Sequence, residues 1–187
     1  MQKILVWGDS LSAAYGIPVE KGWVNLLQKK LGEDYEIING SISGETTQGG
    51  LTRLPNALST HNPDFVILEL GANDGLRGIP PQVTKNNLQE MIEQSIQAKS
   101  KVMLFGMKIP PNYGVAYSEK FEAQFVDLAN TYNLPFIPFF LENVIMDSDL
   151  LQADQLHPTA EAQAIILESI LPPLEKALKT INKVNIK

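Results

Sequence analysis

Residues 65–70 read Phe-Val-Ile-Leu-Glu-Leu, an apolar run that is interrupted only by Glu69. A run of this kind, without alternation of apolar and polar residues, is typical of a strand in a parallel sheet whose two faces are both covered. Four other segments have the composition of strands: Ile4–Trp7, Tyr35–Asn39, Val102–Met107 and Phe136–Phe140. The chain is therefore expected to contain a five-stranded parallel sheet.

The segments between these runs carry apolar residues at helical spacing, as Leu88, Ile92 and Ile96 do. The predicted helices are Trp23–Leu31, Thr46–Leu58, Pro81–Lys99, Glu119–Tyr132 and Pro158–Ile181. Proline lacks an amide hydrogen, so Pro55 is expected to interrupt the second helix near its end. For the same reason the pair Pro172-Pro173 is expected to break the last helix.

The alternation of strands and helices predicts an α/β fold with three layers, α/β/α. Right-handed crossovers between parallel strands favour a doubly wound sheet with strand order 2-1-3-4-5. The sequence shows no internal repeat, linker or low-complexity segment. We therefore expect residues 1–187 to form a single domain.

Composition excludes several classes of function. The 187 residues carry a formal net charge of -6 and no cysteine. An acidic chain lacks the basic stripe that nucleic acids and anionic membranes require, so neither is an expected partner. Without cysteine there is no disulfide, thiolate nucleophile or thiolate metal site. The apolar runs are too short to span a bilayer, so stable membrane insertion is not expected. We also expect the protein to be a monomer.

The amino terminus shows no signal peptide, because Met1-Gln2-Lys3 leads directly into the first predicted strand. The expected location is therefore cytoplasmic, or periplasmic or secreted if a leader has been removed from this sequence.

Polar residues follow the predicted strands at four places. Ser10 follows the first strand, Gly44 the second and Asn73 the third, and the loop with Asp154 and His157 comes after the fifth. Ligands of open parallel sheets bind at the carboxyl ends of the strands. Four segments distant in the sequence are therefore expected to meet at one rim of the sheet.

These residue types suit acyl transfer. A serine hydroxyl such as that of Ser10 is a weak nucleophile until a base removes its proton. His157 is the expected base, with Asp154 three positions earlier as the group that orients its ring. The alternative is that Asp-x-x-His followed by Pro158 forms only a turn and a helix cap. The other histidine, His61, precedes the third strand and is expected on a surface loop at the opposite rim.

Three groups are candidate donors to a developing oxyanion. Asn73 offers a neutral side-chain amide, and Gly44 and Ser10 offer backbone N–H groups. Taken singly, Asn73 and Gly44 are equally compatible with ordinary turns. Asp9 is expected to shape the turn of Ser10 through local hydrogen bonds rather than to take part in chemistry. With two separated histidines and no nucleotide-binding motif, neither a metal nor a cofactor is expected.

The motifs Gly8-Asp9-Ser10-Leu11-Ser12, Gly44, Gly71-Ala72-Asn73-Asp74 and Asp154-Gln155-Leu156-His157 together resemble those of the GDSL/SGNH hydrolases. The resemblance covers nearly the whole chain and is strongest to the bacterial thioesterase I/protease I/lysophospholipase (arylesterase) branch. It implies a flavodoxin-like fold and, in many members, export to the periplasm. Ala72 departs from the glycine frequent in that branch. The implied catalytic set is Ser10, Asp154 and His157, and the implied oxyanion hole is Ser10 N–H, Gly44 N–H and Asn73.

The resemblance also extends to loops that bind substrate in this family. These are residues 75–80 and the segment Ile109-Pro110. It implies an acyl groove lined by Leu76, Ile79, Ile109 and Tyr113. The alternative for each is ordinary packing of a loop against the core.

The predicted function is that of a serine esterase or thioesterase acting on small acyl esters, acyl thioesters and, as a further expectation, lysophospholipids. Two alternatives remain open. One is carbohydrate O-deacetylation, which other members of the resembled family perform. The other is a non-catalytic module that binds a flavin or a protein partner, because the same fold serves unrelated functions.

Overall fold

The computed structural model describes residues 1–182 and contains a sheet of five parallel strands in the order β2-β1-β3-β4-β5. This confirms the predicted fold class and strand order. The strands are β1 Gln2–Gly8, β2 Tyr35–Asn39, β3 Phe65–Glu69, β4 Lys101–Phe105 and β5 Phe136–Ile137. The α-helices are α1 Trp23–Leu31, α2 Thr47–His61, α3 Ala72–Leu76, α4 Pro81–Gln97, α5 Val115–Thr131 and α6 Ala162–Asn182. The short 3-10 helices are η1 Val19–Lys21, η2 Gly32–Asp34, η3 Pro111–Tyr113 and η4 Ser148–Leu150.

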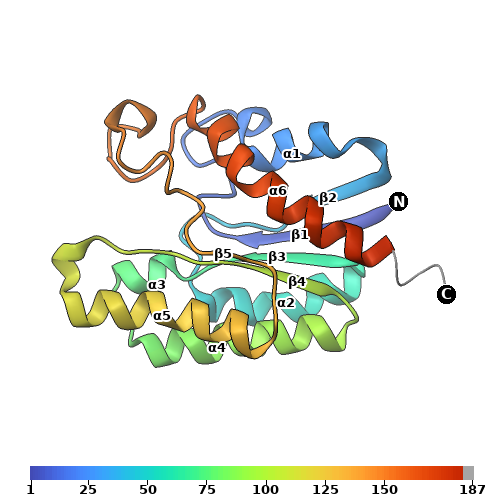
Figure 1. The fold of residues 1–187 in the computed structure, drawn as a ribbon, viewed down its shortest axis with the longest axis horizontal. Helices are drawn as coiled ribbons and strands as arrows, with labels where there is room; N and C mark the ends of the chain where they lie inside the picture. The colour runs from blue at the N-terminus through green and yellow to red at the C-terminus, as the bar shows by residue number, and fades with distance from the viewer. Residues whose placement is uncertain (183–187) are drawn as a thin grey trace.

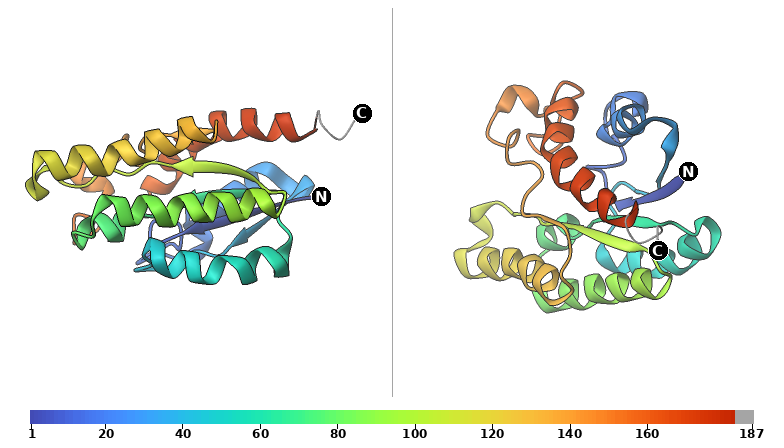
Figure 2. Two further views of the ribbon diagram at one scale, coloured as in Figure 1. Left: turned by 90° about the horizontal axis from the view of Figure 1, so that it is seen from below. Right: turned by 45° about the vertical axis from the view of Figure 1, so that its right-hand side comes forward.

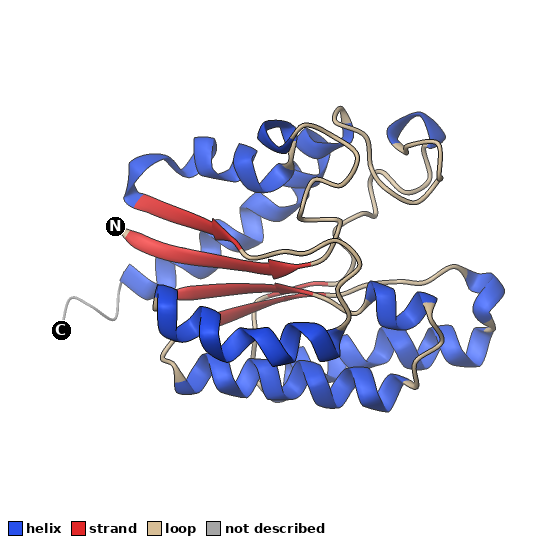
Figure 3. Ribbon diagram, turned by 180° about the vertical axis from the view of Figure 1, so that it is seen from behind, coloured by secondary structure: helices blue, strands red, loops and turns tan. Residues whose placement is uncertain are grey.

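The helices cover both faces of the sheet. Helices α1 and α6 pack together on one face, while α2, α4 and α5 form the other layer, with the short α3 at its end (Figure 1). The two turned views in Figure 2 show the same separation into layers. The strands run in one direction, and the loops after them gather at their carboxyl ends (Figure 3). Within residues 1–182, no helix is both long and apolar enough to cross a membrane.

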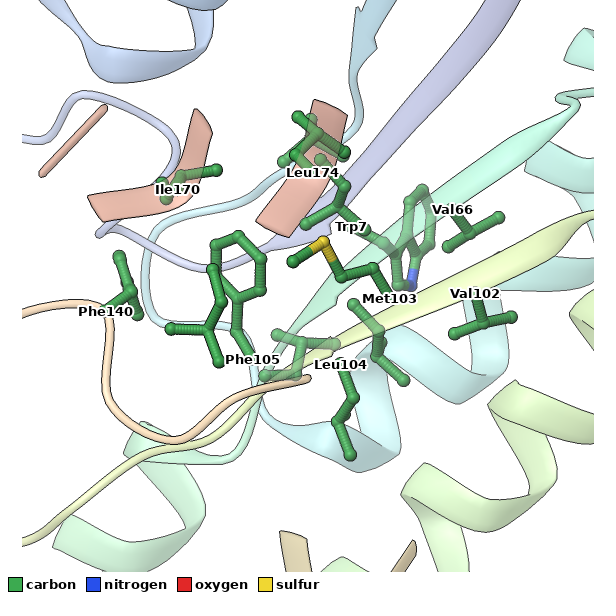
Figure 4. Packing of buried hydrophobic residues seen from close by; sticks show 14 of the residues in the cluster. Trp7, Val66, Val102, Met103, Leu104, Phe105, Phe140, Ile170 and Leu174 are labelled. Carbon is green, nitrogen blue, oxygen red and sulfur yellow. The ribbon is translucent and has the colours of Figure 1, made fainter. Parts of the chain in front are cut away.

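The core lies between the sheet and these layers. The central strand β3 is buried along its whole length, and so are residues 4–8 of β1. Figure 4 shows Phe105 of β4 packing near Phe140 and Ile170, and their neighbours Met103 and Leu174 extend the cluster. The ring centroids of Phe105 and Phe140 are 5.2 Å apart. This packing ties the last helix to β4.

The two expected helix interruptions at proline are wrong. Helix α2 continues through Pro55 to His61, and α6 continues through Pro172 and Pro173. A proline inside a helix costs about 3 kcal/mol because it removes a hydrogen bond and crowds the preceding turn. In α6 this cost is offset by the full burial of Ile170 and Leu174, which flank the pair.

Strand β5 is also shorter than predicted. It contains only two residues, and the apolar segment 138–140 continues as a loop over the carboxyl end of the sheet. Residues 138–140 were predicted as strand because apolar composition alone does not separate a strand from a buried loop.

Truncation of the core should test this packing. The change Phe105→Ala removes a fully buried ring and is expected to lower the free energy of unfolding by about 3–5 kcal/mol. The control Val126→Ala, on the exposed face of α5, should change it by less than about 0.5 kcal/mol. Urea denaturation followed by circular dichroism measures both values. Equal losses in the two variants would contradict the assigned core.

Candidate active site

The register between β1 and β3 sets the position of the candidate nucleophile. Gly8 at the end of β1 pairs with Glu69 at the end of β3, so the residues after both strands emerge side by side. Beyond Gly8 the chain forms a tight turn, in which the backbone N–H of Ala13 donates to the carbonyl of Asp9 at 3.0 Å. The Asp9 carboxylate accepts the N–H of Leu11 at 2.9 Å, as the sequence analysis expected. Ser10 therefore lies on a turn that is stabilised by both the backbone carbonyl and the side-chain carboxylate of Asp9.

The loop after η4 brings His157 to Ser10. The Ser10 Oγ and His157 Nε2 atoms are 2.9 Å apart, and His157 Nδ1 is 2.6 Å from Asp154 Oδ2. Because an ionised carboxylate only accepts hydrogen bonds, Nδ1 carries the proton and Nε2 is left to accept the hydroxyl hydrogen of Ser10. The three side chains thus form a continuous hydrogen-bonded chain across 147 positions of sequence.

Asp154 is fixed by the backbone of its own loop. Its Oδ1 accepts the N–H groups of Leu156 and His157, each at 3.0 Å. Gln155 between them has a left-handed backbone, with φ of 54°. The hydrogen bonds from the backbone and then the ring of His157 lower the pKa of Asp154 from 3.8 to about 2. Asp154 is therefore an anion over the whole range in which a histidine changes charge.

Two residues that the sequence did not indicate as part of the site, Tyr15 and Gln152, also position His157. The ring of Tyr15 lies against its imidazole, with centroids 4.4 Å apart. The side-chain amide of Gln152 donates to the carbonyl of Tyr15 at 2.8 Å and to that of Pro158 at 2.9 Å. Gln152 thereby joins the loop of the nucleophile to the loop of the base. Contacts of this kind leave no sequence signal, because they depend on how two distant loops meet.

Asn73 lies at the start of the short helix α3, directly after β3. Its Nδ2 donates to the carbonyl of Glu45 at 3.0 Å and makes a longer contact of 3.4 Å with Asp9 Oδ2. Glu45 follows Gly44, which has a left-handed backbone with φ of 80°. Asn73 therefore connects the loop after β2 with the turn of Ser10.

Helix α3 is anchored from beneath by Asp74. Its buried carboxylate accepts the backbone N–H of Thr47 at 2.8 Å, the hydroxyl of Thr47 at 2.5 Å and that of Thr84 at 3.0 Å. These donors come from the first turns of α2 and α4. Asp74 thus fixes the neighbour of Asn73, a role that the sequence suggested only as turn formation.

A cavity of about 450 Å³ opens at this rim and includes Ser10, Asn73 and His157 in its wall. Of the four predicted groove residues, Leu76 and Ile109 line it. Tyr113 does not line it, and its hydroxyl donates instead to the carbonyl of Leu76 at 3.0 Å. Ile79 does not line it either, and its backbone carbonyl accepts the hydroxyl of Tyr117 at 2.8 Å.

Most of the apolar wall comes from residues that the sequence analysis did not assign. They are Met107, Pro111, Phe139, Leu141, Ile145, Met146 and Leu156. These residues come from the loops after β4 and β5 and from the loop of His157. They could have been found in the sequence as apolar residues that follow the carboxyl ends of strands, since these ends meet at the same edge of the sheet. Met146, at the edge of the cavity, is 91% exposed.

His61 lies far from this site. It ends α2, ahead of β3, and its carbonyl accepts a hydrogen bond from Lys3 Nζ at 3.2 Å. The prediction of the opposite rim is confirmed, although His61 belongs to a helix rather than to a loop. In residues 1–182 no group of three or more His, Cys, Asp or Glu side chains is placed to hold a metal ion.

The chain is similar to known proteins along most of its length. The model of the GDSL-like Lipase/Acylhydrolase family matches residues 6–165. An arylesterase of Vibrio mimicus is 47% identical over 180 residues, covering 95% of this chain and 90% of that protein. The Escherichia coli (strain K12) protein named thioesterase 1/protease 1/lysophospholipase L1 is 39% identical, covering 92% and 83%.

A solved structure shows the same arrangement of the chain. The psychrotrophic esterase EstA from Pseudoalteromonas sp., inhibited by monoethylphosphonate, superimposes with a TM-score of 0.92. It is 42% identical, over 96% of this chain and all of that one. On the family match, the identities and this coverage, the chain belongs to the GDSL-like lipase/acylhydrolase family.

Proposed function

We propose that the protein hydrolyses carboxylic esters and thioesters through an acyl-enzyme formed on Ser10. The observation that carries this proposal is the hydrogen-bonded chain from Ser10 Oγ through His157 to Asp154, with distances of 2.9 and 2.6 Å. The first distance allows Ser10 to transfer its proton to His157, and the second allows Asp154 to orient the ring of His157. Membership of an acylhydrolase family supports the same chemistry.

The proposed reaction has two halves. In the first, Ser10 Oγ attacks the substrate carbonyl carbon while His157 Nε2 takes the hydroxyl proton, and His157 then gives that proton to the departing alcohol or thiol. In the second, His157 removes a proton from water, which attacks the acyl carbon and releases the acid and Ser10. Asp154 holds the ring in the correct tautomer and stabilises the imidazolium in both halves.

The negative oxygen of each tetrahedral intermediate needs donors that are already in place. We assign this role to Asn73 Nδ2 and to the backbone N–H groups of Ser10 and Gly44. The 3.4 Å hydrogen bond from Asn73 Nδ2 to Asp9 Oδ2 orients this amide but is long, so its N–H can turn to an oxyanion when one forms. The left-handed backbone of Gly44 supports its assignment, because a side chain there would be strained.

The apolar cavity beside Ser10 favours an acyl chain over a sugar as the group that is bound. A sugar needs several polar partners, whereas side chains such as Met107, Phe139 and Leu141 offer only apolar contact. The names arylesterase and thioesterase 1/protease 1/lysophospholipase L1 of two relatives support ester and thioester substrates. The net charge of -6 supports small molecules rather than nucleic acid as partners.

Removal of the nucleophile or base should abolish turnover. We expect Ser10→Ala and His157→Ala to lower kcat by about 10⁴-fold or more, since neither variant can complete the proton transfer. The matched control His61→Ala should keep the kcat of the wild type. Steady-state hydrolysis of a p-nitrophenyl ester measures this, with fluorophosphonate labelling as a second readout. Turnover at the wild-type rate by Ser10→Ala would refute the assignment.

Loss of the side-chain donor should act on the transition state. We expect Asn73→Ala to lower kcat by about 10²–10³-fold while KM changes little, because the donor acts on charge that is absent from the ground state. Fluorophosphonate labelling of Ser10 should persist at a reduced rate. A change confined to KM would show instead that Asn73 only binds substrate.

The cavity predicts the preferred acyl group. With p-nitrophenyl esters of increasing chain length, kcat/KM should rise from acetate to medium chains as apolar area is buried, at roughly 0.8 kcal/mol per buried methylene. An acyl-CoA, a lysophospholipid and an acetylated sugar complete the panel and identify the leaving group. A clear preference for the acetylated sugar would show that the protein is a carbohydrate O-deacetylase.

A further inference from the structure

Two carboxyl groups lie buried directly beneath the nucleophile. Asp9 is 1% exposed and Glu69 is 0% exposed, and they come from the paired ends of β1 and β3. In the part of the chain that the structure describes, neither forms an ion pair with lysine or arginine. A buried carboxylate without a cation is costly, so this pair calls for an explanation.

Full burial, the lack of a cation and an oxygen without a hydrogen-bond donor all disfavour an ionised Glu69. Its Oε1 accepts the hydroxyl of Ser12 at 2.5 Å, whereas its buried Oε2 receives no hydrogen bond from an amide or hydroxyl donor. The Glu69 and Asp9 carboxyl groups interact with each other. Two ionised carboxylates have no proton to share, so a hydrogen bond between them requires that one be an acid.

Burial decides which group keeps the proton. Full desolvation, followed by the charge of Asp9, raises the pKa of Glu69 well above 4.5. Desolvation also raises the pKa of Asp9, to about 6, but the N–H of Leu11, a hydrogen bond with Glu69 and the charge of His157 oppose this. At neutral pH Asp9 is therefore the anion and Glu69 the acid that donates to it.

The Asp9 anion contacts the turn of Ser10 and the amide of Asn73. It accepts the N–H of Leu11 at 2.9 Å, which holds the turn after Ser10. Its other oxygen lies 3.4 Å from Asn73 Nδ2 and so orients that amide. The charge of His157 lowers the pKa of Asp9 and so favours this anion. The orientation of the Asp9 carboxylate therefore affects both the turn of Ser10 and the amide of Asn73.

We propose that Glu69 is a positioning residue, a buried carboxylic acid whose hydrogen bond fixes Asp9 and thereby aligns Ser10 and Asn73 for acyl transfer. This inference rests on the proposed function, since it assigns Glu69 a role in the geometry of that reaction. Glu69 itself touches neither the substrate nor the reacting atoms.

A pair of variants separates the hydrogen bond from simple packing. Glu69→Gln keeps a neutral side chain with a donor, so its kcat should stay within about threefold of the wild type. Glu69→Leu fills similar space without a donor, and its kcat should fall about 10–100-fold with little change in KM, the cost of a small misplacement of reacting groups. Gln124→Leu, which replaces a buried polar side chain on α5, should leave kcat unchanged.

Infrared spectroscopy of the wild type measures the protonation of Glu69 directly. At about pH 7.5 the wild type should show the carbonyl stretch of a buried protonated carboxylic acid, and Glu69→Gln should lack it, because ordinary carboxyl groups are ionised there. This readout does not depend on whether Glu69→Leu folds.

The stability of the folded protein gives a second measure of the same proton. A folded-state pKa raised above 4.5 means that the folded state binds more protons, so the stability that Glu69 contributes falls as pH rises from 4.5 through its folded-state pKa. Glu69→Gln should lose that part of the pH dependence of the thermal midpoint.

The outcomes are distinct. Absence of the infrared band from the wild type, or equal kcat in Glu69→Leu and the wild type, would overturn the role of Glu69. If Glu69→Gln lost as much kcat as Glu69→Leu, the donor role would be wrong as well. In each case an inactive Ser10→Ala variant would leave the proposed function standing, whereas an active Ser10→Ala variant would remove both.

Discussion

The parallel pairing of β1 with β3 is the constraint on which the site depends. It places Gly8 opposite Glu69, and the chain continues from these two residues into Ser10 and Asn73 respectively. A slip of one residue in this register would turn every side chain of the strand to the other face. The proposed nucleophile Ser10 and the proposed oxyanion donor Asn73 therefore owe their proximity to the central hydrogen bonds of the sheet.

His157, the third residue of the site, lies near the carboxyl end of the chain. The loop with His157 follows β5 and is held at the rim by Gln152, by contact with Tyr15 and by the burial of α6 behind it. The loop of His157 and the loop after β5 also supply part of the apolar wall of the cavity. The segments that hold the proposed base therefore also shape the proposed substrate cavity.

The buried carboxyl groups show how polar groups can serve a site without facing the substrate. Asp74 accepts hydrogen bonds from threonine donors beneath α3, whereas Asp9 and Glu69 lie buried at the paired strand ends beneath Ser10. Both arrangements stabilise short backbone segments that carry functional side chains. A buried polar network of this kind is rigid when all its members are satisfied.

The sequence by itself determined the fold class, the strand order and the residues that meet at the rim. Apolar runs identify the buried strands locally, and the carboxyl ends of parallel strands must meet at one edge of the sheet. Tertiary structure alone decided the rest. It kept α2 and α6 intact through their prolines, since burial elsewhere in these helices outweighs a missing hydrogen bond. It also selected Met107 and Phe139 rather than Ile79 and Tyr113 for the cavity wall. It brought Tyr15 and Gln152 to His157 and buried Glu69 beside Asp9, contacts that depend on where distant loops and strand ends come to lie.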